Sequence, residues 1–138
     1  MALELNFEIE EGNFSIAGKA SSKIKKVLKQ LNIDSKCIKQ IVIAIYEAEV
    51  NVVAHSFGGN LKALIAEDGI EITIKDKGPG IESIEKAMET GFSTASKKVR
   101  EMGFGAGMGL PNIKKNTDDL NIESKIGEGT TLTFRNNF

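Results

Sequence analysis

One segment constrains the fold more than any other: residues 34–57 are rich in apolar side chains and carry three polar side chains at a four-residue spacing. Asp34 and Ser35 are typical of a helix start, and the apolar residues that follow occupy nearly every side of a helix. A helix of that kind is buried, so we expect it to be the central helix of the domain. Glu47, Asn51 and His55 recur every fourth residue, which places them on one stripe of this helix.

This polar stripe has two interpretations. Polar groups on a buried helix cost free energy unless a partner or a ligand satisfies them. Three such groups facing one way indicate a polar cavity that could receive a ligand. The simpler interpretation is that neighbouring loops or strand ends satisfy each group separately.

The first half of the chain contains further strand and helix patterns. Residues 3–9 alternate between apolar and polar side chains, as in a half-buried strand, and Phe14 and Ile16 suggest a partner strand. Ser21-Ser22 favours a helix start before an apolar stripe that ends at Leu31. The apolar runs 61–67 and 70–75 flank Asp68-Gly69, which is a strong hairpin signal.

The second half of the chain completes the expected architecture. It predicts a short helix over 81–89, a mobile loop over 90–109, a helix from about Leu110 with Pro111 in its first turn, and strands over 120–126 and 130–135. The order of these elements predicts an α+β fold, a two-layer sandwich with helices on one face of a mainly antiparallel sheet. The 138 residues fit one domain that spans residues 1–138.

Charge and cysteine content limit the partners. Eighteen Lys and Arg against 19 Asp and Glu give a net charge of −1, which argues against a nucleic-acid or membrane-surface binder. Residues 19–39 contain seven lysines and a single acidic residue, Asp34. This cluster is either a solvated helix face or a docking face for an acidic partner. One cysteine, no leader-like segment and no apolar run long enough for a membrane span predict a cytoplasmic protein.

Two glycine-rich segments carry the chemistry. In Asp76-Lys77-Gly78-Pro79-Gly80, a carboxylate that can accept a hydrogen bond from an amine precedes a turn that lets the backbone approach a ligand closely. The cluster Gly103–Gly109 precedes a predicted helix, and its exposed N–H groups suit phosphates, with Lys97, Lys98 and Arg100 nearby. Each segment alone is weak evidence for a ligand site, and the second could be a loop that binds no ligand.

Taken in order, the stripe and the two glycine segments resemble the GHKL ATP-binding fold of gyrase, Hsp90, histidine kinases and MutL. The resemblance covers essentially the whole chain and implies the two-layer Bergerat fold, with ATP and Mg²⁺ as cofactors. Three segments are particularly similar to the bacterial anti-sigma regulatory factors and stress-response switch kinases: Gly91-Phe92-Ser93-Thr94, Gly109-Leu110-Pro111 and Gly127-Glu128-Gly129-Thr130.

The resemblance implies a role for each matching residue. Glu47 would accept the proton of the attacking hydroxyl, Asn51 would offer its carbonyl to Mg²⁺, and Asp76 would hold the adenine amino group. Thr130 would support Asp76 directly or through water. The adenine pocket would be shaped by Gly78 and Gly80, and the phosphates would be wrapped by Gly105, Gly107 and Gly109. The resemblance leaves open which of Lys97, Lys98 and Arg100 contacts the γ-phosphate.

The implied function is that of a serine/threonine protein kinase that phosphorylates a small antagonist protein of the STAS type. The alternative is a nucleotide-loaded module that sequesters or activates a partner with little or no phosphoryl transfer. The resemblance leaves open whether a sigma factor is bound directly. It also leaves open whether the first strand, at a sheet edge, supports a homodimer.

Overall fold

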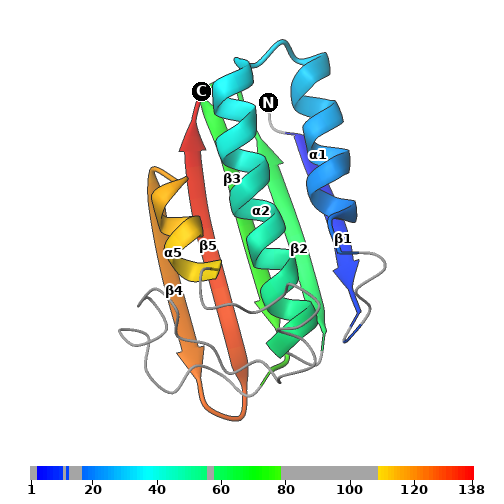
Figure 1. The fold of residues 1–138 in the computed structure, drawn as a ribbon, viewed down its shortest axis with the longest axis vertical. Helices are drawn as coiled ribbons and strands as arrows, with labels where there is room; N and C mark the ends of the chain where they lie inside the picture. The colour runs from blue at the N-terminus through cyan, green and yellow to red at the C-terminus, as the bar shows by residue number, and fades with distance from the viewer. Residues whose placement is uncertain (1–2, 11, 13–16, 56–57, 79–108) are drawn as a thin grey trace.

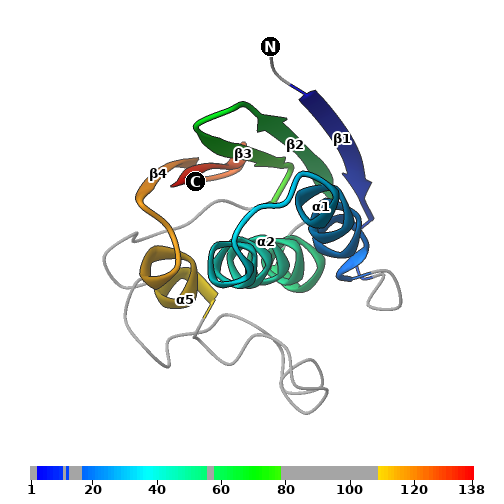
Figure 2. The same cartoon turned by 90° about the horizontal axis from the view of Figure 1, so that it is seen from above.

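The computed structural model describes residues 3–10, 12, 17–55, 58–78 and 109–138. Within these ranges, five strands form one antiparallel sheet in the order β1-β2-β3-β5-β4, and three helices cover one face of it (Figures 1 and 2). This confirms the expected α+β architecture. The elements are β1 (Leu3–Ile9), α1 (Lys19–Gln30), α2 (Ser35–His55), β2 (Gly59–Ile65), β3 (Gly69–Asp76), α5 (Gly109–Lys115), β4 (Asp119–Lys125) and β5 (Gly129–Asn137).

The core lies between the sheet and the helices α1, α2 and α5. Alternate residues of the central strands point towards the helices, so that Ile72 of β3 and Phe134 of β5 are paired neighbours that are almost wholly buried. Ile41 and Ala48 of α2 are fully buried within the same core. On the other face of the sheet, Thr73 pairs with polar neighbours on both sides. The sheet therefore has one packed face and one polar face, as antiparallel sheets commonly do.

Several sequence predictions are confirmed. The central helix begins at Ser35, where the Asp34 carboxylate accepts hydrogen bonds from the N–H groups of Lys36 and Cys37. The Asp68-Gly69 hairpin joins β2 and β3, and β4 and β5 pair as predicted. The helix α5 begins at Gly109, one residue earlier than expected. The predicted strand around Phe14 and Ile16, the helix over 81–89 and all of the loop over 90–109 except Gly109 lie outside the described residues.

The predicted Ser21-Ser22 cap of α1 is wrong. This helix begins at Lys19, and the carboxylate of Glu49 on α2 accepts hydrogen bonds from the N–H groups of Gly18, Ala20 and Ser21 at 3.1, 3.2 and 2.9 Å. The Ser21 hydroxyl instead donates to the Gly18 carbonyl at 2.9 Å. A buried carboxylate from the neighbouring helix thus satisfies the free N–H groups and meets the positive end of the helix dipole.

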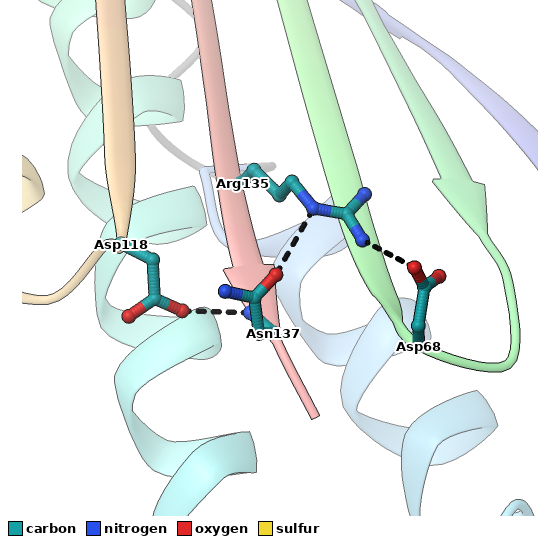
Figure 3. A network of polar contacts seen from close by, with 4 residues as sticks. All are labelled: Asp68, Asp118, Arg135 and Asn137. Carbon is teal, nitrogen blue, oxygen red and sulfur yellow. Dashed lines mark hydrogen bonds and ion pairs between the residues drawn. The ribbon is translucent and has the colours of Figure 1, made fainter.

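A network of polar contacts joins the end of β5 to the β2–β3 turn and to Asp118, just before β4 (Figure 3). Arg135 on β5 bonds the side chain of Asn137 at 3.1 Å and forms an ion pair with Asp68 in the β2–β3 turn at 3.2 Å. The Asn137 N–H donates to Asp118, just before β4, at 2.7 Å. Because the Asp68 side chain is 80% exposed, the ion pair adds little stability, at most about 1 kcal/mol.

Within the residues that the structure describes, no helix combines the length and apolar character needed to cross a bilayer.

Candidate nucleotide site

The predicted site residues that the structure describes lie on elements that meet towards one end of the molecule. The C-terminal turns of α2, the end of β3 and the start of β5 all lie at the same end, shown at the bottom of Figure 1. Glu47 and Asn51 lie on α2 and are both half-buried. Asp76 is the last residue of β3, and Thr130 is the second residue of β5.

The Asp76 carboxylate is held in a fixed orientation by two backbone amides. The N–H groups of Gly78 and Thr130 donate to Oδ1 at 2.9 and 3.0 Å. Among the described residues, Oδ2 receives no hydrogen bond. Since a carboxylate oxygen can accept only, Oδ2 is suited to an incoming N–H donor such as an amine.

Two glycines close around the backbone of Asp76. Gly129 has a φ of +112°, and a Cβ there would overlap the Asp76 carbonyl oxygen. On the other side, a Cβ at Gly59 would lie 2.9 Å from the Asp76 Cα and would overlap the Lys75 carbonyl oxygen. The position of the carboxylate therefore depends on two residues without side chains, on the strands that flank β3.

This arrangement predicts that Gly129→Ala destabilises the protein by about 2 kcal/mol or more, because it adds backbone strain to a steric overlap. Gly127→Ala is the matched control, since Gly127 also has a positive φ of +82° but open space around its Cβ position. That variant should lose only about 1 kcal/mol, from strain alone. Urea unfolding of both variants measures the difference, and equal losses would contradict the steric role of Gly129.

Thr130 supports Asp76 through its backbone rather than its side chain. The N–H group makes the contact, while the hydroxyl pairs with the Ser124 hydroxyl on β4 at 2.8 Å. The Ser124 hydroxyl also lies within bonding distance of the Gly129 carbonyl, at 3.3 Å. Ser124 therefore belongs to the structure around the site, although nothing in its local sequence indicated that.

Glu47 is a half-buried carboxylate on α2, next to α5. Burial raises its pKa above the usual range for glutamate, and a hydrogen bond from Asn112 partly offsets the rise. The donor is the Asn112 side-chain amide on α5, 3.4 Å from Oε1. A carboxylate with a raised pKa holds a proton more readily, which is the property that a general base requires.

Asn51 lies one helical turn beyond Glu47, and among the described residues its side-chain amide makes no hydrogen bond. The same part of the chain contains no group of three or more His, Cys, Asp or Glu side chains that could hold a metal ion. A magnesium ion here would therefore take an oxygen from Asn51 and its remaining ligands from phosphates and water. That is the usual way in which Mg²⁺ is bound beside a nucleotide, and the residues present fit it.

The structure describes only some of the remaining predicted site residues. Gly78 is buried beside Asp76, and Gly109 is the first residue of α5. His55 ends α2, but its side chain is outside the described part. Outside the described residues altogether lie Gly80, Lys97, Lys98, Arg100, Gly105 and Gly107.

The comparisons with known proteins agree with this fold. The family model described as a histidine kinase-like ATPase domain matches residues 16–136, so the chain belongs to that family. This confirms the resemblance drawn from the ordered motifs. One relative is the anti-sigma F factor of Thermoanaerobacter sp. (strain X514), 34% identical over 94% of this chain and 89% of its own length. Another is the serine/threonine-protein kinase RsbT of Bacillus subtilis (strain 168), 33% identical over 78% of both chains.

Two solved structures share the fold. The RsbU and RsbW domains of a Mycobacterium tuberculosis protein align with 97% of this chain at a TM-score of 0.65 and 19% identity. This chain covers only 32% of that longer one. In the SiaB–SiaC complex from Pseudomonas aeruginosa, the matching chain aligns at a TM-score of 0.58 and 11% identity, over 97% of this chain and 89% of that one.

Proposed function

We propose that this chain is an ATP- and Mg²⁺-dependent serine/threonine protein kinase of the partner-switching type, which phosphorylates a small STAS-type antagonist protein. The observation that carries this proposal is Glu47, a half-buried carboxylate one turn before Asn51 in a member of an ATPase family. Holding a nucleotide requires no base at that position, whereas transfer to a hydroxyl requires an acceptor for its proton. The relative named as a serine/threonine-protein kinase supports the same reaction.

The proposed role of each residue follows from its chemistry. Asp76 accepts a hydrogen bond from the adenine amino group through Oδ2, because Oδ1 is already engaged by two amides. Asn51 offers an amide oxygen to Mg²⁺, which when bound would neutralise charge on the phosphates. Glu47 accepts the proton of the attacking Ser or Thr hydroxyl. The roles of Gly80, Gly105 and Gly107 rest on the resemblance alone.

The lysine-rich surface supports a protein partner with an acidic face. The seven lysines are Lys19, Lys23, Lys25, Lys26, Lys29, Lys36 and Lys39. All of them are exposed, and none forms a salt bridge with a described residue. Since the whole chain has a net charge of −1, this positive charge is local to α1 and the start of α2. A local field of this kind favours association with a partner of opposite charge.

A transfer assay tests the proposal. The purified chain is incubated with γ-labelled ATP, Mg²⁺ and a STAS-type antagonist protein, and the label on the antagonist is located by mass spectrometry. We expect phosphate on a Ser or Thr of the antagonist, and none when the Mg²⁺ is chelated. An unlabelled antagonist, under conditions where nucleotide binding is demonstrated, would contradict the kinase assignment.

The relatives named anti-sigma F factor favour a second function, in which the nucleotide-loaded chain binds a regulatory partner such as a sigma factor without transferring phosphate. In that case, complex formation in a pull-down would depend on ATP, and Glu47→Ala would leave it unchanged. A kinase would show the same binding together with transfer that depends on Glu47.

A further inference from the structure

The helix α5 joins the glycine cluster to the proposed base. Its first residue, Gly109, is the last glycine of the cluster, and Leu110 and Ile113 anchor the helix in the core with exposed fractions of 8% and 0%. Between these anchors, Asn112 extends its side chain to Glu47 on α2. Because Leu110 and Ile113 are buried on either side of Asn112, the backbone from which the Asn112 side chain extends has a well-defined position.

Two further asparagines, Asn116 and Asn136, hold the backbone of α5 around Asn112. The side-chain amide of Asn136, a buried residue of β5, donates to the backbone carbonyl of Asn116 at 2.8 Å. The side-chain amide of Asn116 donates to the backbone carbonyl of Asn112, also at 2.8 Å. The Asn112 amide then donates to Glu47 Oε1 at 3.4 Å. The first two bonds hold the backbone of α5 at Asn116 and Asn112, and from that backbone the Asn112 side chain reaches the proposed base.

We propose that Asn112 is a positioning residue for phosphoryl transfer, which holds the Glu47 carboxylate in place so that its second oxygen can accept the substrate proton. This inference rests on the proposed kinase function and deepens it. A glutamate side chain rotates about several bonds, and one donor on Oε1 removes much of that freedom. Among the described residues, Oε2 receives no hydrogen bond, so it is the oxygen available for the proton. Rates of reactions between oriented groups depend steeply on such placement.

Three variants test this role. Asn112→Leu keeps a similar size but has no donor, Asn112→Gln keeps a donor, and Lys114→Ala changes an exposed residue of the same helix as a control. We expect Asn112→Leu to lower kcat by about tenfold or more while KM for ATP stays within about twofold. Asn112→Gln should recover most of the lost rate, and Lys114→Ala should behave as the parent chain. An unchanged kcat in Asn112→Leu would overturn the role.

A merely structural role would give a different pattern. In that case Asn112→Leu and Asn112→Gln would both raise KM and lower the unfolding midpoint, and the donor retained in Asn112→Gln would not restore the rate. That result would contradict the proposal. The contact itself is measured independently of catalysis by NMR of the free protein. Glu47→Gln should shift the side-chain amide resonances of Asn112, which are assigned by their loss in Asn112→Leu.

This second measurement separates the two proposals. If the parent chain transfers no phosphate while the Asn112 resonances shift, the kinase assignment fails although the contact is present. If the chain is an active kinase and the resonances do not shift, the positioning role is overturned and the kinase assignment stands.

Discussion

Replacing Glu47 with alanine should lower the rate of phosphoryl transfer by about 10²- to 10⁴-fold, the usual contribution of a general base. Nucleotide affinity should stay nearly unchanged, because Glu47 has no proposed contact with the nucleotide. Glu47→Gln, which keeps the shape and loses the base, should show a similar loss. Steady-state kinetics with labelled ATP give the rate, and the nucleotide-dependent thermal shift gives the affinity.

Glu71→Gln is the matched control, because Glu71 is also half-buried but lies on the polar face of the sheet, away from the helices. It should leave both quantities unchanged. Equal losses of transfer and nucleotide affinity in Glu47→Ala would contradict the assignment of Glu47 as the base.

The same residue predicts a pH dependence. Burial raises the pKa of Glu47 above the usual glutamate range, and only the ionised carboxylate can accept a proton. The transfer rate should therefore rise as the pH increases through this raised pKa, level off above it, and fall as the pH drops. This acid limb should be absent from the residual activity of Glu47→Gln, and an identical limb in that variant would assign the titration to another group.

Replacing Asp76 with asparagine should nearly abolish the stabilisation of the protein by nucleotide. The asparagine carbonyl can still accept the hydrogen bonds from Gly78 and Thr130, so the free protein should unfold at almost the same midpoint. Its NH₂ group, however, would take the place of Oδ2 and would face the adenine amino group donor to donor. The loss of such a hydrogen bond, with an unpaired donor left in its place, costs about 1–3 kcal/mol.

Thermal unfolding with and without ATP and Mg²⁺ measures this loss. At 100 times the dissociation constant, a ligand stabilises the native state by about 2.7 kcal/mol, which falls to about 0.4 kcal/mol when affinity drops 100-fold. Asp119→Asn, an exposed residue at the start of β4, is the control and should respond to ATP as the parent chain does. A full nucleotide response in Asp76→Asn would contradict the adenine assignment, and a lower midpoint without nucleotide would assign Asp76 a structural role instead.

Local patterns were sufficient where a short stretch of sequence decides the conformation. The Asp68-Gly69 pair predicted its hairpin because few residues suit such a tight turn. The apolar surface of residues 34–57 predicted a buried helix, and Asp34 predicted where it starts. In the same way, the spacing of Glu47 and Asn51 placed both side chains on one stripe, because helix geometry is regular.

The start of α1 shows where such reasoning fails. Ser21-Ser22 has good local chemistry for a cap, but Glu49 lies 28 residues away from Ser21 along the chain and provides two carboxylate oxygens. Once packing brings that carboxylate to the helix end, it outcompetes a serine hydroxyl, because a charged acceptor forms the stronger hydrogen bond.

The sequence by itself predicted the order of the described elements and the α+β architecture, because these depend on periodicity and on short motifs, while the resemblance proposed the residues of a nucleotide site. Only the tertiary structure decided which groups hold those residues in place. Asp76 is oriented by the Thr130 amide and confined by Gly59 and Gly129, and Glu47 is contacted by Asn112, 65 residues away. The physical reason is that hydrogen-bond partners and steric limits depend on distance in space, which only the packed sheet and helices establish.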